Sequence, residues 1–285
     1  MAEFVEIFEV GPRDGLQNEA RMIPADEKIA LIDALSLAGF RRIEVASFVS
    51  PKWVPQMADG AEVLAGLTRA PGVRYAALTP NMTGYERARA AGADEVAIFG
   101  SASEGFSRAN INATIAESLD RFAPVAAAAR ADGVPLRGYV SCVTDCPYDG
   151  PTPPAAVARV AAALFAMGCY EISLGDTIGQ GRPETVAAML DAVLAEVPAN
   201  RLAGHYHDTG RRALDNIEVS LEKGLRVFDA AVGGLGGCPY AKGATGNVAT
   251  EAVDDRLRAL GHETGLDRDR LLAAAGRARA MRGQA

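Results

Sequence analysis

Cysteine, histidine and lysine are all scarce in this chain of 285 residues. The four cysteines lack the spacing of a small secreted domain, so free thiols in a reducing compartment are expected instead of a disulfide framework. Histidine occurs three times, and two of the three stand close together as His205 and His207. The lysines all fall in segments expected to be helices or loops: Lys28, Lys52, Lys223 and Lys242. Schiff-base chemistry, which needs a lysine on an inner strand, is therefore not expected.

Long apolar runs are also missing, since no stretch approaches the roughly 18 residues that a membrane-spanning helix needs. The formal net charge of −7 argues against nucleic acid or an anionic membrane surface as the main partner. The first ten residues alternate polar with apolar and include acidic side chains, so neither a signal peptide nor a transit peptide is expected there. We therefore expect a cytoplasmic globular protein, and 49% hydrophobic residues are enough for a sizeable core.

Short β-branched runs alternate with alanine-rich helical segments along the whole chain. Eight of these runs are expected to be strands: 5–10, 42–47, 73–78, 96–100, 136–142, 171–174, 202–207 and 227–232. Helices are expected between them, for example over 26–37 and 154–167, and glycines such as Gly39 and Gly168 end helices just before a strand.

This alternation predicts an α/β protein with a parallel sheet, and eight units in about 250 residues match a closed (β/α)8 TIM barrel. We expect one domain over residues 1–285, with a C-terminal helical extension from about residue 250. An open, doubly wound sheet is the alternative. It is disfavoured because no G-x-G-x-x-G follows a strand.

Polar residues cluster where the expected strands end. In a (β/α)8 barrel the active face lies at the carboxyl ends of the strands. The clusters are Arg13-Asp14 after the first strand, Glu44 and Ser47 late in the second, Asp176-Thr177 after the sixth, and His205 to Asp208 at the seventh. Their positions predict an active site at this end of the barrel.

The pair His205 and His207 predicts a metal site. Residues i and i+2 of a strand face the same side, so both imidazoles would point into the barrel near its mouth. Neutral imidazoles side by side are natural ligands for a divalent cation, and two hydrogen-bonded core histidines are the alternative. Asp14 is the best third ligand, because the first, seventh and eighth strands adjoin once the barrel closes. Two histidines and one carboxylate leave positions open for substrate oxygens.

The kind of cation depends on the remaining ligands. Asn247 follows a glycine-rich stretch and can add an amide oxygen. Carboxylate and amide oxygens favour Mg²⁺ or Mn²⁺, whereas the histidine pair alone would equally accept Zn²⁺ or Co²⁺. Because no lysine is placed for a Schiff base, carbon–carbon bond chemistry here would need a metal as its electron sink.

Two further side chains can act beside the metal. Arg13 can stabilise the oxyanion of an enolate or thioester, or form a salt bridge with Glu44, and both roles can hold together. Residues 233–240 are rich in glycine and predict a mobile loop able to close over a ligand, with Cys238 at its tip. That thiol can serve as a general acid or base. The other cysteines are expected to be buried: Cys142, Cys146 and Cys169.

Several segments of the chain resemble the hydroxymethylglutaryl-CoA lyases. They read VGPRDGLQNE (10–19), SFVSPKWVPQM (47–57), RGYVSC (137–142), GCYEISLGDTIG (168–179) and GLGGCPYAKGATGNVATE (234–251). The resemblance extends over roughly residues 4–275 without an obvious gap. The Arg-Asp and His-x-His motifs are shared by the wider group of barrel metallolyases and Claisen-type synthases, whereas the Gly-Gly-Cys-Pro-Tyr loop is more specific to the lyases.

The resemblance implies an oxo-acid lyase, a homodimer with Mg²⁺ or Mn²⁺, that cleaves 3-hydroxy-3-methylglutaryl-CoA to acetoacetate and acetyl-CoA, as in leucine degradation and ketone-body formation. It implies four metal ligands: Asp14, His205, His207 and Asn247. It implies four catalytic residues, which are Arg13 for the enolate, Asp14 or a bound water as base, Cys238 as the thiol acid, and Glu44 as a supporting acid. It also implies four residues that line the pocket: Gln17, Ser47, Ser173 and Thr177.

Two other enzymatic interpretations are open. A Claisen-type acyl-CoA synthase, such as an isopropylmalate or homocitrate synthase, shares the metal motif but not the cysteine loop. The other is a lyase for a longer 3-hydroxy-3-alkylglutaryl-CoA, because Gly210, Arg211 and Arg212 replace the Tyr-Gly-Gln that members of the family typically have there. These arginines could contact CoA phosphates or a different acyl tail, but a solvated helix start is the simpler interpretation.

Overall fold

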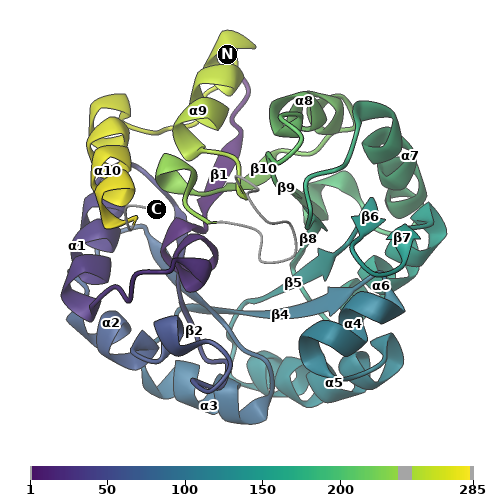
Figure 1. Ribbon diagram of the computed structural model, residues 1–285, viewed down its shortest axis with the longest axis horizontal. Coiled ribbons are helices and arrows are strands. Elements are labelled where there is room, and N and C mark those ends of the chain that lie inside the picture. Colours follow the sequence, from purple (N-terminus) through teal and green to yellow (C-terminus); the bar gives the residue numbers. More distant parts are fainter. Residues whose placement is uncertain (1, 237–245, 283–285) are drawn as a thin grey trace.

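The computed structural model describes residues 2–236 and 246–282, and its parallel strands close into a barrel (Figure 1). The hydrogen-bonded order is β1-β10-β9-β8-β5-β4-β3-β2, and β2 pairs with β1 to complete the circle. The barrel strands are β1 (Glu6–Glu9), β2 (Arg42–Ser47), β3 (Arg74–Leu78), β4 (Glu95–Ser101), β5 (Leu136–Ser141), β8 (Glu171–Asp176), β9 (Leu202–Tyr206) and β10 (Val227–Ala230). The predicted (β/α)8 barrel is therefore confirmed.

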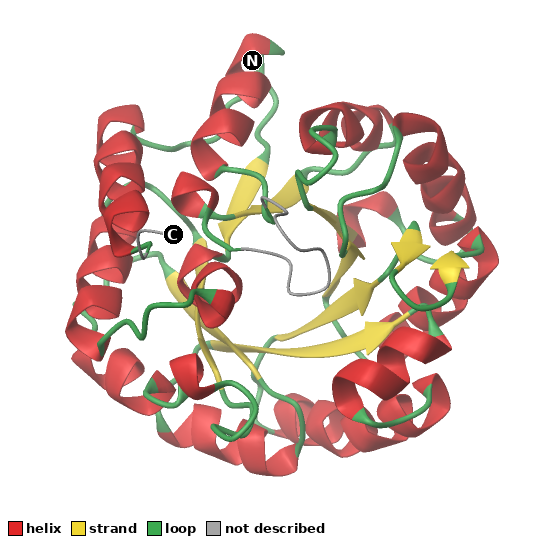
Figure 2. Cartoon of the chain, in the orientation of Figure 1, coloured by secondary structure: helices red, strands yellow, loops and turns green. Residues whose placement is uncertain are grey.

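Helices surround the barrel on its outside (Figure 2). Their bounds are α1 (Ala25–Ser36), α2 (Gly60–Gly66), α3 (Met82–Ala90), α4 (Glu104–Ile111), α5 (Ile115–Ala131), α6 (Pro154–Ala166), α7 (Pro183–Leu194), α8 (Ala213–Glu222), α9 (Thr250–Ala259) and α10 (Arg268–Met281). A short antiparallel pair, β6 (Asp145–Cys146) with β7 (Gly150–Pro151), follows β5. Among the described residues, no helix combines the length and apolar character needed to cross a membrane.

All eight predicted strands are present, and their ends differ from the prediction by at most two residues. Gly39 and Gly168, after α1 and α6, have φ values of 99° and 104°, which suits the helix ends predicted there. One difference concerns the site, because β9 ends at Tyr206 and His207 lies just beyond it. His207 instead forms an isolated antiparallel bridge with Asn247, which keeps its backbone extended and its side chain on the same side as His205.

Buried charged residues fill the barrel interior toward the amino-terminal ends of the strands. Arg42 on β2 and Arg137 on β5 both contact Glu171 on β8, and Arg137 also contacts Asp229 on β10. Each of these side chains is at most 7% exposed. Most apolar side chains pack instead between the barrel and its helices. The polar interior therefore lies directly beneath the carboxyl ends of the strands.

Glu9 ties three segments together at the carboxyl end of β1. Its Oε1 accepts hydrogen bonds from the backbone N–H groups of Gly11 (2.7 Å) and Val232 (2.9 Å), and its Oε2 accepts one from the Thr250 hydroxyl (2.7 Å). Complete burial raises the pKa of Glu9 to about 7, although these hydrogen bonds oppose the rise. The turn that carries Asp14 is therefore fastened to the segment after β10 by a carboxyl group that holds its proton up to about pH 7.

Replacing Glu9 with glutamine is expected to make protein stability less dependent on pH. The folded-state pKa lies above the unfolded one, so the folded state binds the extra proton and stability is lost as the pH rises from about 4.5 through about 7. Glutamine stays neutral; its oxygen can accept from Gly11 and Val232, and its NH₂ group can donate to the Thr250 hydroxyl oxygen. The variant should therefore gain about 2–3 kcal/mol over the wild type at pH 8 and little at pH 4.5. Urea unfolding at both pH values measures this. An equal difference at the two pH values would contradict it.

Candidate metal and active site

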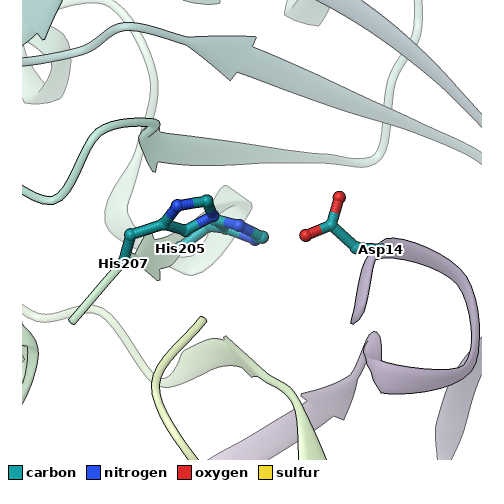
Figure 3. Close-up of side chains that lie close together, drawn as sticks. All are labelled: Asp14, His205 and His207. Carbon is teal, nitrogen blue, oxygen red and sulfur yellow. The ribbon is translucent and has the colours of Figure 1, made fainter. Parts of the chain in front are cut away.

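Three potential metal ligands meet at the mouth of the barrel (Figure 3). Asp14 lies in the π-helical turn Gly11–Gly15 directly after β1, while His205 is in β9 and His207 follows that strand. One ligand atom of each residue lies within 4.8 Å of the other two. Because β1 and β9 both pair with β10, closure of the barrel brings the carboxylate to the histidines.

The ring nitrogens of the two histidines have different surroundings. Nδ1 of His205 lies 3.1 Å from Oδ2 of Asp229, which leaves Nε2 for a ligand. Nδ1 of His207 is buried and has no hydrogen-bond partner within the described ranges. A buried nitrogen without a partner is costly unless a ligand uses it. The donor set of Asp14, His205 and His207 therefore fits a divalent cation.

The Asp14 carboxylate is held from two sides. Its Oδ1 accepts hydrogen bonds from Arg13 Nη1 (2.6 Å) and Gln17 Nε2 (2.9 Å). Its Oδ2 accepts one from Asn247 Nδ2 (2.8 Å), so the amide oxygen is the atom that Asn247 can offer a cation. The structure thus brings all four predicted metal ligands together.

The charges at this site suit metal binding. Burial tends to raise the pKa of Asp14, but Arg13 and the two histidines outweigh it and lower the pKa to about 2. Burial and the neighbouring His205 lower the pKa of His207 to about 4. At neutral pH Asp14 is therefore an ionised carboxylate and His207 a neutral imidazole, which are the ligand forms of these two side chains. Burial tends to lower the pKa of His205, but the hydrogen bond to Asp229 and the charges of Asp229 and Asp14 outweigh burial and raise it.

Arg13 is 5% exposed and lies between two carboxylates. Its Nε donates to Glu44 Oε2 at 2.5 Å, and its Nη1 donates to Asp14. The predicted salt bridge between Arg13 and Glu44 is therefore present. Burial raises the pKa of the Glu44 carboxyl and Arg13 opposes that rise, while Glu44 Oε1 has no partner among the described atoms. The two carboxylates fix the guanidinium beside the triad formed by Asp14, His205 and His207.

A cavity of about 770 Å³ opens above the triad. Arg13, Asp14, His205 and His207 form part of its wall, and so do two of the residues expected to line a pocket: Gln17 and Thr177. Apolar side chains also line it, among them Val49, Val54, Phe99, Phe106 and Ile111, together with polar residues such as Ser50, Asn81 and Arg121. The cavity therefore combines reactive polar groups with apolar surface.

Ser47 and Ser173, also expected to line the pocket, do not line this cavity. Both are buried, at 2% and 0% exposure. Ser47 accepts a hydrogen bond from the Val49 backbone N–H (3.4 Å), and Ser173 donates to Asp229 at 2.7 Å. Both hydroxyls are therefore hydrogen-bonded within the protein, and Ser173 contacts the buried charged layer through Asp229 although its register partner on β5, Tyr139, lines the cavity.

Cys238 and the second half of its glycine-rich loop (237–240) lie outside the described residues, so the predicted role of this thiol stays a prediction. The expectation for the other cysteines is confirmed: Cys142, Cys146 and Cys169 are free and buried. Arg211 is exposed and Arg212 precedes α8 as its N-cap residue. Neither arginine lines the cavity, which agrees with a solvated helix start.

Tyr139 on β5 was not singled out from the sequence, although its side chain lines the cavity beside Arg13. The Arg13 guanidinium lies 5.5 Å from the centre of its ring. Its hydroxyl is buried and has no hydrogen-bond partner in the described part of the chain. Burial raises the pKa of Tyr139, so the phenol keeps its proton as a donor. The sequence could have indicated it, because Tyr139 lies two residues after Arg137 on the same strand and therefore faces the same side of the sheet, the barrel interior.

A (β/α)8 barrel with two histidines and a carboxylate at its mouth defines a class of barrel proteins that can hold a catalytic divalent cation. Within that class, the chain belongs to the HMGL-like family, which matches residues 4–277. The resemblance found in the sequence motifs is thereby confirmed.

Individual relatives cover nearly all of the chain. A protein of Pseudomonas aeruginosa named 3-hydroxy-3-isohexenylglutaryl-CoA/hydroxy-methylglutaryl-CoA lyase is 57% identical, over 98% of this chain and 93% of its own. A Danio rerio protein named 3-hydroxy-3-methylglutaryl-CoA lyase, cytoplasmic, is 58% identical, over 93% of this chain and 79% of its own. The crystal structure of HMG-CoA lyase from Brucella melitensis is 67% identical, covers 99% of both chains and has a TM-score of 0.98.

Proposed function

We propose that this chain is a divalent-cation-dependent carbon–carbon lyase that cleaves 3-hydroxy-3-methylglutaryl-CoA to acetoacetate and acetyl-CoA. The observation that carries the proposal is the Arg13 guanidinium fixed beside the triad of Asp14, His205 and His207 in one cavity. Names of relatives that are 57% and 58% identical support the same reaction.

The reaction breaks the C2–C3 bond of the substrate. Mg²⁺ or Mn²⁺ held by Asp14, His205, His207 and Asn247 would polarise the C3 hydroxyl and the free carboxylate of the substrate. The hydroxyl proton passes to Asp14 or to a water molecule, C3 becomes the ketone of acetoacetate, and the electron pair of the broken bond forms the thioester enolate. Arg13 stabilises the enolate oxygen through its charge and its N–H groups.

The enolate must then receive a proton at C2 to become acetyl-CoA. We assign this proton to the Cys238 thiol, because Cys238 belongs to the Gly-Gly-Cys-Pro-Tyr segment typical of the lyases. Glu44 supports the reaction indirectly, since its contact is with Arg13. Buried Tyr139 offers a further hydroxyl donor at the same wall of the cavity.

A second candidate substrate is a 3-hydroxyglutaryl-CoA with a longer alkyl group at C3. The apolar residues in the cavity lining favour it, because Val49, Val54, Phe99, Phe106 and Ile111 could bury an alkyl chain. The Pseudomonas aeruginosa relative carries such a substrate in its name. Comparing kcat/KM for the methyl and isohexenyl substrates tests this, and a ratio below about a tenth for the isohexenyl compound would reject it.

The biological setting is also proposed. We infer a role in leucine degradation or ketone-body formation, a cytoplasmic location and a homodimer. These inferences are supported by the family and not by a contact in this single chain. Light scattering of the purified protein measures the oligomeric state.

The central test mixes the purified protein with Mg²⁺ or Mn²⁺ and 3-hydroxy-3-methylglutaryl-CoA and follows acetoacetate. We expect cleavage that EDTA abolishes, and a loss on the order of 10²–10⁴-fold in kcat for Cys238→Ala, the usual contribution of acid–base catalysis. No cleavage by the metal-loaded wild type would reject the lyase. Full activity of Cys238→Ala would reject only the assignment of the thiol.

A further inference from the structure

Asp229 contacts one of the two histidines and fixes how that imidazole can be used. A neutral imidazole carries a proton on one ring nitrogen and a lone pair on the other. The Asp229 carboxylate can only accept, and its Oδ2 lies 3.1 Å from Nδ1 of His205. With Asp229 as its partner, a neutral His205 therefore donates from Nδ1 and keeps the lone pair on Nε2. His207 has no such partner at its own Nδ1 within the described residues.

The position of Asp229 follows from the barrel. On β10 it is the register partner of His205 on β9, and its side chain is completely buried. Arg137 donates to both of its oxygens, from Nη1 at 3.0 Å and from Nη2 at 2.7 Å, and Ser173 donates to Oδ2 at 2.7 Å. Three fixed donors leave the carboxylate no freedom to rotate away from the imidazole.

The negative charge of Asp229 is balanced by the guanidinium of Arg137. A buried carboxylate without a cation would take up a proton, and a protonated carboxyl could no longer serve only as an acceptor. Arg137 supplies the cation and is itself held by Glu171, with its Nε 2.7 Å from Oε1. Glu171 also pairs with Arg42. The charged layer under the cavity thus keeps Asp229 ionised and in place.

We propose that Asp229 is a positioning residue that holds His205 as the Nδ1–H tautomer and directs Nε2 toward the cation site. Such carboxylate–histidine contacts orient the ring and increase its basicity as a ligand. The proposal rests on the part of the proposed function in which Asp14, His205 and His207 hold a divalent cation. It does not depend on which thioester is cleaved.

The first test reads the tautomer in the wild type. The chain has only three histidines, so a two-bond ¹H–¹⁵N correlation spectrum of ¹⁵N-histidine-labelled protein can be assigned with single His→Gln variants. In EDTA at pH 9, we expect His205 to carry its proton on Nδ1. A proton on Nε2 of His205 overturns the proposal, and this result needs no variant of Asp229.

The second test measures metal affinity without substrate, by the EPR signal of free Mn²⁺. Asp229→Asn can donate as well as accept, so we expect His205 to show both tautomers and the dissociation constant for Mn²⁺ to rise about 10–100-fold. Glu171→Gln is the matched control, because it removes a charge from the same network one contact further from His205, while the amide oxygen can still accept from Arg137 Nε and hold that guanidinium in place. It should stay within about threefold of the wild type.

Comparing the Mn²⁺ affinities of the two variants separates a positioning role of Asp229 from general disruption of the charged network. Equal weakening by Asp229→Asn and Glu171→Gln, or an unchanged affinity in Asp229→Asn, overturns the proposal. Absence of Mn²⁺ binding by the wild type overturns it together with the metal-dependent reaction. A protein that binds Mn²⁺ in this way and does not cleave 3-hydroxy-3-methylglutaryl-CoA would contradict only the proposed function.

Discussion

Replacing Asp14 with asparagine is expected to lower kcat/KM for 3-hydroxy-3-methylglutaryl-CoA on the order of 10³-fold, because the cation supplies several kcal/mol of transition-state stabilisation. The substitution removes the anionic ligand. Whichever way the new amide is turned, its NH₂ group faces a hydrogen-bond donor. Arg13 and Gln17 donate to Oδ1 in the wild type, and Asn247 donates to Oδ2. If Asn247 turns its amide to accept from the new residue, its oxygen leaves the site.

Acetoacetate production at saturating Mg²⁺ or Mn²⁺, with a Mn²⁺ titration of each protein, measures this effect. Asp208→Asn is the matched control, because Asp208 follows His207 directly but belongs to neither the triad nor the cavity wall. Its Oδ1 accepts from the Ala213 backbone N–H at the start of α8. We expect the control to keep its activity within about threefold. An Asp14→Asn enzyme with more than a tenth of the wild-type kcat/KM would contradict Asp14 as a ligand.

Replacing Arg13 with methionine is expected to reduce kcat on the order of 10²–10³-fold, the usual cost of removing a donor from a developing oxyanion. The change also leaves Glu44 buried without its cation. Burial already raises the pKa of Glu44, and losing Arg13 removes the main opposing influence, so we expect Glu44 to take up a proton and the fold to survive with reduced stability.

The double variant Arg13→Met/Glu44→Gln separates the two consequences. A neutral glutamine needs no cation, so the double variant should recover stability in a thermal unfolding scan and should not recover kcat. Arg13→Lys keeps the charge but cannot contact Glu44 and Asp14 with one planar group, so it should restore activity only in part. A kcat within threefold of the wild type for Arg13→Met would contradict the enolate role.

Regular patterns along the chain were sufficient to predict the strands and three of the candidate metal ligands. Alternation of β-branched and alanine-rich segments predicts each barrel strand to within two residues. Residues two apart share a side of an extended chain even where the ladder has ended, so His205 and His207 were predicted correctly to face one direction although His207 lies outside β9. The choice of Asp14 needed only the additional expectation that the barrel closes.

Contacts between distant strands could not be predicted in the same way. Arg137 and Asp229 are 92 residues apart, and their pairing depends on the register of β5, β8, β9 and β10 within the closed barrel. The sequence predicts that Ser173 lines the pocket. Only the packing of neighbouring strands decides that its hydroxyl donates to Asp229 and does not reach the cavity. The same holds for Tyr139, because only its three-dimensional surroundings leave its hydroxyl without a hydrogen-bond partner among the described residues.

The sequence by itself therefore determined the barrel, the family and the ligand types, because these follow from local periodicity and from motifs that are continuous in the chain. The tertiary structure alone decided which nitrogen of His205 faces Asp229, that Arg13 lies between Glu44 and Asp14, and which predicted residues reach the cavity. Those properties arise from angles and distances between side chains on different strands, and they exist only after the barrel has closed.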